Sequence, residues 1–139
     1  MKFLIGLIAA LLMGWAWHGP LGHGEALVFA LETQARAQVA SAGIPGVTVS
    51  LGHHPLSRAA TLSGTANDFQ RNGLGGQPGL TDLVQGVEGI SSVRWADTPG
   101  KGFTLPLLAE TLILVTLAYL IGLGAAWLLW GRKRREGFA

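Results

Sequence analysis

Residues 111–130 are the most constraining stretch of the sequence, because they hold twenty consecutive residues without a formal charge. About twenty apolar residues are what an α-helix needs to cross the hydrocarbon core of a bilayer. Four cations follow this stretch after a single glycine: Arg132, Lys133, Arg134 and Arg135. Basic clusters beside a membrane helix stay on the cytoplasmic side. We therefore predict a transmembrane helix over residues 109–130 and a basic cytoplasmic tail over residues 131–139.

The N-terminal end of the chain has the form of a secretory signal. Lys2 precedes an apolar run over residues 3–17, which matches the positive start and apolar centre of such a signal. Cleavage needs small residues at two positions, and tryptophans beside Gly14 and Ala16 make a poor site. We predict an uncleaved signal anchor, or first transmembrane helix, over residues 1–17; the alternative is a cleaved signal peptide. Both alternatives place the middle of the chain outside the inner membrane.

Small residues recur at every fourth position in both apolar segments. They are Gly6, Ala10 and Gly14 in the first segment and Ala118, Gly122 and Ala126 in the second. Small residues at this spacing let the backbones of two membrane helices approach closely. Glycine and alanine are also common throughout membrane helices, which is the alternative explanation. We interpret these six positions as helix-packing residues.

Composition excludes several classes of function. The chain contains no cysteine, so it has no disulfide, thiolate metal site or cysteine nucleophile. Residues 18–110 carry five cations and seven anions, a formal charge of −2. The basic excess of the chain therefore lies in the membrane flanks, where topology requires it. Without a basic patch on the domain, we expect no binding of nucleic acid.

The sequence predicts a small α+β domain over residues 25–97, with linkers at residues 18–24 and 98–108. Helical segments show apolar residues at a spacing of about four, and strands show apolar residues in alternation with polar ones. The expected elements are a helix over residues 25–42, strands over 47–51 and 59–65, a short helix over 80–87 and a strand over 90–96.

The expected core follows from the faces that these elements share. On the first helix, Leu27, Leu31, Ala35 and Val39 recur at four-residue spacing. The expected core residues are Leu31, Ala35, Val39, Val47, Val49, Leu62, Leu83, Val84, Val93 and Trp95. The glycine-rich residues 67–79 predict an ordered loop or a broken helix, with Asp68 able to cap a helix and Pro78 suited to a first helical position.

Three short motifs accompany this order of elements: GVTVSL at residues 46–51, TLSGT at 61–65 and VEGISSVRW at 87–95. Together they resemble the BON domain, a small module of bacterial envelope proteins. Gly64 stands where that family has a glycine at the end of a strand, and Gly89 where it has a glycine in the turn into its last strand. The resemblance covers about half of the chain and implies an α-β-β-α-β domain, here flanked by two transmembrane α-helices.

The sequence also departs from this family. The region after Gly64 is rich in glycine where the family has a regular helix, and the first turn holds His53, His54 and Pro55. The resemblance implies a role that is not enzymatic, namely binding of phospholipid or of other envelope proteins. It does not identify a particular ligand.

Motifs that carry catalysis are missing from the sequence. The glycine-rich GLGGQPG at residues 73–79 lacks the lysine of a phosphate-binding loop, and no G-x-S-x-G or H-E-x-x-H occurs. The four histidines lack the spacing of a helical or hairpin ligand pair: His18, His23, His53 and His54. We therefore predict that the chain is not an enzyme and has no catalytic residue, cofactor, metal or small-molecule substrate.

These observations predict a protein of the bacterial inner (cytoplasmic) membrane with a periplasmic central domain and a cytoplasmic C-terminus. Its first expected function is that of an accessory or assembly subunit of a larger complex, with other integral membrane proteins as partners. The alternative is a stand-alone envelope tether that touches membrane lipid. Glu110 marks the outer rim of the second span or contacts a partner within the membrane. Trp95 is a core residue or, where exposed, a partner-facing anchor.

Overall fold

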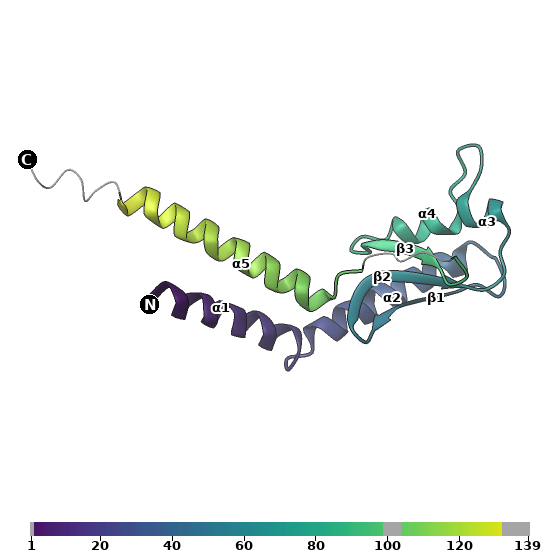
Figure 1. The fold of residues 1–139 in the computed structure, drawn as a ribbon. Helices are drawn as coiled ribbons and strands as arrows, with labels where there is room; N and C mark the ends of the chain where they lie inside the picture. Colours follow the sequence, from purple (N-terminus) through teal and green to yellow (C-terminus); the bar gives the residue numbers. More distant parts are fainter. Residues whose placement is uncertain (1, 99–103, 132–139) are drawn as a thin grey trace, which may run out of the picture. The chain divides into compact units, whose positions relative to one another are not determined.

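The computed structural model describes residues 2–98 and 104–131. The chain divides into two compact units, a helical unit of Met1–Leu21 with Leu108–Ala139 and an α+β unit of Gly22–Leu107. Figure 1 shows the elements in chain order. The four basic residues that are expected to set topology, Arg132 to Arg135, lie outside the described residues, and so does the side chain of Lys2.

The helical unit contains α1 (Lys2–His18), α5 (Leu107–Ala126) and the π-helical turn η1 (Trp127–Gly131). Leu107–Leu129 is the one described helix that is by itself long and apolar enough to cross a membrane. The 17 residues of α1 reach only about 25 Å at 1.5 Å per residue, less than the roughly 30 Å of a hydrocarbon core. Among the described residues the structure therefore shows one single helix of spanning length, and not the two that the sequence predicted.

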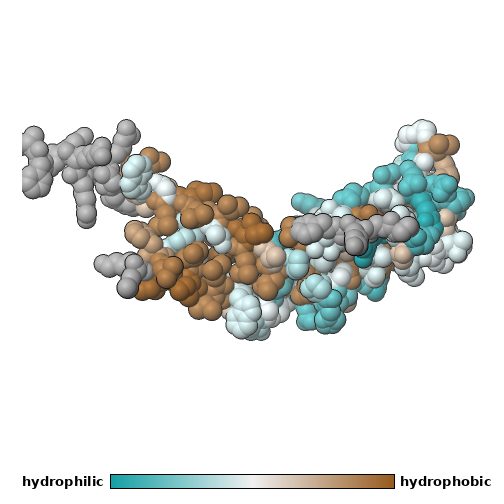
Figure 2. Space-filling model, viewed as in Figure 1, coloured by the Kyte–Doolittle hydropathy of each residue, from teal (hydrophilic) through white to brown (hydrophobic). Residues whose placement is uncertain are grey.

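Apolar side chains cover the helical unit, whereas polar side chains dominate much of the visible surface of the α+β unit (Figure 2). On α1, Phe3, Leu4 and Ile5 are each more than 60% exposed, and on α5 Ile121 is 71% exposed. Exposed apolar surface on this scale is unusual for a water-soluble protein and is typical of a surface that lipid or a partner covers.

The first helix of the α+β unit is α2 (His23–Ser41), and it buries a stripe that differs from the predicted one. Leu27 is 44% exposed, whereas Val28 is fully buried together with Leu31, Ala35 and Val39. An α-helix has 3.6 residues per turn, so residues spaced strictly four apart move gradually around it. Residues spaced alternately three and four apart stay on one face. The prediction was therefore wrong for Leu27.

A three-stranded sheet packs against α2 (Figure 1). The strands are β1 (Thr48–His53), β2 (Leu56–Ser63) and β3 (Ser92–Trp95), in the spatial order β1-β2-β3. The pair β1–β2 is antiparallel and the pair β2–β3 is parallel. Both hairpin strands run further into residues 52–58 than the sequence predicted, and a register shift at Leu51/Gly52 accommodates the extension.

Two short helices, α3 (Asp68–Asn72) and α4 (Leu80–Gln85), make the crossover to the parallel strand β3. Asn67 caps α3, because its side-chain oxygen accepts from the backbone N–H of Gln70 at 2.8 Å. The expected cap Asp68 is instead the first helical residue. Pro78 precedes Gly79, the N-cap of α4, so its expected place as a first helical residue was also wrong.

The core confirms seven of the ten predicted residues as buried: Leu31, Ala35, Val39, Val49, Leu62, Val84 and Trp95. Val47 and Val93 are partly buried against this core, and Leu83 is of intermediate exposure. The core also contains apolar residues that the sequence reading omitted: Val28, Leu51, Ala60, Leu80, Val87, Ile90 and Leu107. The structure is thus a small α+β unit around one core, with a helix of spanning length beside it in the chain.

Candidate functional site

The contact between α1 and α5 depends on two glycines of α1. A β-carbon at Gly6 would lie 2.8 Å from the hydroxyl oxygen of Tyr119, and one at Gly14 would lie 3.3 Å from a methyl group of Val115. The Tyr119 hydroxyl donates a hydrogen bond to the backbone oxygen of Phe3 at 2.5 Å. A larger residue at Gly6 would therefore force the Tyr119 side chain out of this contact between the two helices.

The small residues of α5 do not take part in this contact in the same way. Ala118 and Gly122 are exposed, and a β-carbon at Gly122 would meet no atom within 4 Å. Ala126 is of intermediate exposure, as is Ala10 on α1. The structure therefore leaves Gly122 out of the helix pair. Tyr119 and Val115 contribute the α5 side of the contact instead.

Trp95 is a core residue and not an exposed anchor. Only 6% of it is exposed, and its indole N–H donates to the hydroxyl of Thr81 at 3.1 Å. The guanidinium carbon of Arg71 lies 4.2 Å from the centre of a Trp95 ring. The core alternative for Trp95 is therefore confirmed, and the exposure on which a partner-facing role depended is not observed. Glu110, the other residue expected to contact a partner, lies in the first turn of α5 at intermediate exposure.

Arg71 also joins α3 to the end of β3. Its guanidinium donates to both carboxylate oxygens of Asp97, at 2.9 and 2.6 Å. The hydrogen bond from Arg71 holds the pKa of Asp97 below its usual value. The side chain of Asp97 is 59% exposed, so this ion pair adds little to the free energy of unfolding. Its main effect is to hold α3 beside the end of β3.

A buried carboxylate on α2 is the polar centre of the α+β unit. Glu32 is only 6% exposed, and its oxygens contact Arg36, the Nε2 atom of His53 at 2.8 Å and the backbone N–H of Leu51 at 3.4 Å. In the sequence, Glu32 and Arg36 form an i, i+4 pair on a helix face other than that of Leu31 and Ala35. Burial alone would raise the pKa of Glu32, but the hydrogen bonds from His53 and Leu51 and the charge of Arg36 lower it.

We predict that Glu32→Gln removes part of the acid sensitivity of folding. Because the pKa of Glu32 is lower in the folded chain, its ionised form stabilises that state above the unfolded pKa, and this stability is lost as pH falls through the folded pKa. Glu32→Gln should cost roughly 1–3 kcal/mol at pH 7 and less below pH 4. Urea unfolding at the two pH values measures this difference. Glu25→Gln, at an exposed position of the same helix, is the control, and an equal loss at both pH values would contradict the prediction.

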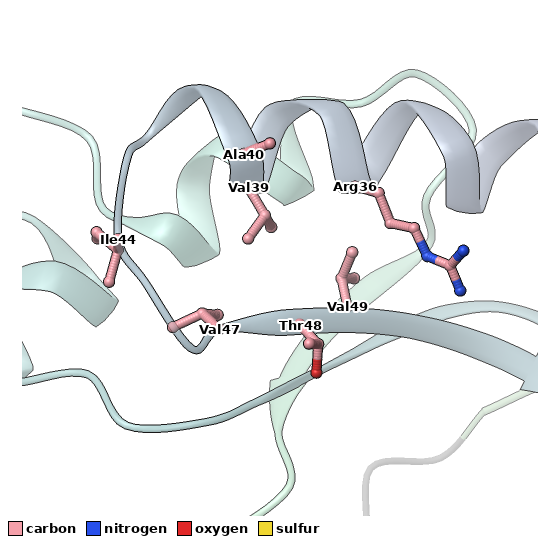
Figure 3. A pocket seen from close by; sticks show the side chains of 7 residues that line it. All are labelled: Arg36, Val39, Ala40, Ile44, Val47, Thr48 and Val49. Carbon is pink, nitrogen blue, oxygen red and sulfur yellow. The ribbon is translucent and has the colours of Figure 1, made fainter.

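A groove opens between the second half of α2 and the start of β1 (Figure 3). Its volume is about 280 Å³, and its lining is apolar except for Arg36 and Thr48: Arg36, Val39, Ala40, Ile44, Val47, Thr48 and Val49. Val39 of α2 and Val49 of β1 point toward one another across the space, and Thr48 points away from the helix (Figure 3). From the sequence, Val39, Val47 and Val49 were expected in the core, and no local pattern indicates a groove beside them.

The histidines are dispersed in the structure. Among residues 2–98 and 104–131, no three His, Asp or Glu side chains gather in a way that could hold a metal ion. His53 contacts one carboxylate oxygen of Glu32, and Arg36 contacts the other. The hydrogen bond between His53 and Glu32 joins the β1–β2 hairpin to α2.

Comparisons with known proteins identify no relative of this chain. The function proposed below therefore rests on the surfaces described above. No family model matches the chain, and neither a curated protein nor a solved structure matches it significantly.

Proposed function

We propose that this chain is a membrane-anchored, non-enzymatic interaction module, an accessory or assembly subunit of a larger complex in the bacterial inner membrane. The observation that carries the proposal is the two-sided character of α5. Tyr119 and Val115 contact α1, whereas Ala118 and Gly122 are exposed on the same apolar helix of spanning length. An open face of small residues is suited to close packing against a further membrane helix.

The α+β unit supports the proposed kinship with BON domains by the order of its elements. A helix, two strands, a helical crossover and a third strand follow one another from α2 to β3. Gly64 and Gly89 have φ angles of 125° and 102°, which side-chain-bearing residues rarely adopt. Under this kinship the alternative function is an envelope tether that binds phospholipid or other envelope proteins through the α+β unit.

We predict that Gly122→Leu and Gly6→Leu separate the two faces of α5. The chain has no cysteine, so the pair Gly14→Cys and Val115→Cys reports the α1–α5 contact by disulfide cross-linking in membranes. Gly6→Leu should abolish most of this cross-link, because its side chain would collide with Tyr119. Gly122→Leu should keep the cross-link and lose the larger complex on a native gel in mild detergent. A free monomer for the unsubstituted chain would favour the tether instead.

We predict that both termini are cytoplasmic and that the α+β unit is periplasmic. The reasons are Lys2, the basic cluster at residues 132–135 and the two apolar segments. A reporter that fluoresces only in the cytoplasm should glow when it is fused after Ala139, and a dark fusion would contradict this topology. Replacement of all four basic residues by glutamine should increase the fraction of inverted chains.

A further inference from the structure

We propose that the first two turns of α2, residues 23–30, lie in the lipid interface of the membrane that the apolar helices enter. Their exposed face rests among the headgroups and the upper acyl chains, and it requires no particular headgroup. This inference rests on the proposed membrane anchoring. It goes beyond that function by naming the surface through which the α+β unit contacts the bilayer.

The exposed surface of α2 changes character halfway along the helix. Within residues 25–30 the exposed positions are apolar apart from Glu25: Ala26, Leu27, Phe29 and Ala30. Phe29 is the most exposed of the large side chains of this helix, at 69%. Within residues 33–41 most exposed positions are polar: Thr33, Gln34, Arg36, Gln38 and Ser41. A single exposed apolar residue is ordinary, but an apolar half-helix before a polar one indicates an interaction surface.

The packing of α2 decides which face this surface occupies. The stripe that begins at Val28 is buried against the sheet, so α2 cannot cross the membrane and only its opposite face is free. A helix turns by about 100° per residue, which puts Ala26 and Ala30 at the centre of that face. Leu27 and Phe29 then lie on its two flanks. The small residues let the helix approach the bilayer, and the large ones reach into it on either side.

Short connections hold the α+β unit close to the apolar helices at both of its ends. α1 ends at His18 and α2 begins at His23, and five residue steps span at most about 18 Å. At the other end, Leu107 is the first residue of α5 and is itself buried in the core of the α+β unit. The predicted linker over residues 98–108 therefore ends inside the core and leaves no free chain before α5. A unit anchored in this way has to lie at the bilayer surface.

Groups that avoid hydrocarbon set the depth of α2. Trp15 and Trp17, both exposed near the end of α1, are of the residue type that collects at membrane interfaces. The irregular backbone of residues 19–22 cannot face lipid in the hydrocarbon core, because its polar groups would lack partners there. Glu25 lies at the edge of the apolar face and stays in water at an interfacial depth. An apolar helix face at this level is buried by about 5–10 Å, and the polar half of α2 then rises out of the interface.

The test uses the purified full chain in nanodiscs of phosphatidylethanolamine and phosphatidylglycerol. The chain has no cysteine, so Leu27→Cys and Phe29→Cys each take a single nitroxide label. Collision of the label with oxygen, which concentrates in lipid, is compared with collision with a water-soluble nickel complex. The ratio of oxygen to nickel collision should be several-fold higher at 27 and 29 than for Ala37→Cys and Gln38→Cys. These two controls are exposed on the polar half of the same helix.

A charge placed on the apolar face should lift it out of the lipid. Phe29→Glu should lower the oxygen-to-nickel ratio of a label at position 27 several-fold, because an ionised carboxylate is costly to remove from water. Ala37→Glu adds the same charge to the polar half and should leave that ratio unchanged. Both positions are exposed, so neither substitution disturbs the core.

A label on α5 separates this inference from the proposed function. Ile121→Cys, at an exposed position of α5, reports membrane insertion itself. A lipid-like ratio at 121 with water-like ratios at 27 and 29 would overturn this inference and leave the anchoring intact. Water-like ratios at all three positions would overturn both. Labels that are water-accessible in nanodiscs but shielded in native membranes would show that a protein covers this face, which also contradicts the lipid contact.

Discussion

Replacement of Trp95 by alanine should lower the free energy of unfolding of the α+β unit by about 3–5 kcal/mol, the usual cost of removing a buried aromatic side chain. Three contacts would be lost together. The indole leaves a cavity among core side chains, Thr81 loses the donor at 3.1 Å and the guanidinium of Arg71 loses the ring below it. A small domain can have a total stability of about the same size, so this substitution brings the unit close to unfolding.

Urea unfolding of the full chain in nanodiscs, followed by hydrogen exchange of the β2 amides, measures this loss in the α+β unit alone. Trp95→Phe keeps most of the buried ring and removes the N–H, so it should cost less than the alanine variant. Trp15→Ala, at a residue that is 53% exposed on α1, is the matched control and should leave the β2 amides unchanged. A change below about 1 kcal/mol for Trp95→Ala would show that the ring is not a central core residue.

The sequence was sufficient to predict elements whose periodicity is local. The alternation VTVSL predicted β1, and the stretch of uncharged residues predicted the spanning helix α5. Trp95 was expected inside because it shares a strand face with Val93, and the structure places it there. These predictions rest on side-chain periods of 2 and about 3.6, which a single segment displays without knowledge of its neighbours.

Features made by distant segments could not be predicted in the same way. The sequence indicates only an i, i+4 pair of Glu32 with Arg36, whereas Glu32 is buried and its oxygens also meet His53 and Leu51 of the hairpin. Each of these hydrogen bonds joins residues that lie about twenty positions apart in the sequence, so no local sequence pattern predicts it. The groove beside Arg36 has the same origin, because residues of both α2 and β1 line it.

The crossover between β2 and β3 lies between these two cases. The glycines of residues 73–79 predicted either an ordered loop or a broken helix, and the structure contains both. Leu74 and Gln77 pair their backbones across a turn at Gly75 and Gly76, and this small hairpin separates α3 from α4. Glycine marks where a helix ends, but the conformation of the turn depends on positive φ angles that a one-letter sequence does not specify.

Replacement of Gly64 by alanine should destabilise the α+β unit by about 3 kcal/mol or more, although it adds only one carbon. Two effects combine at this position. The φ angle of 125° belongs to a region that residues other than glycine rarely adopt, at a cost of about 1–3 kcal/mol. A β-carbon there would also lie 2.1 Å from the backbone oxygen of Gly46, which is far inside van der Waals contact.

Gly46→Ala separates these two effects and is the matched control. Gly46 also has a positive φ angle, of 78°, but a β-carbon there would meet no atom within 4 Å. Gly46→Ala should therefore lower the free energy of unfolding only by the cost of a left-handed backbone conformation, about 1–2 kcal/mol. Urea unfolding measures the free energy of unfolding of both variants. The difference between the two values is the cost of the collision at position 64. A Gly64→Ala chain as stable as the Gly46→Ala chain would show that the end of β2 can move away from the loop before β1. Glycine at position 64 would then reflect backbone conformation alone, and its value as a mark of kinship with BON domains would be reduced.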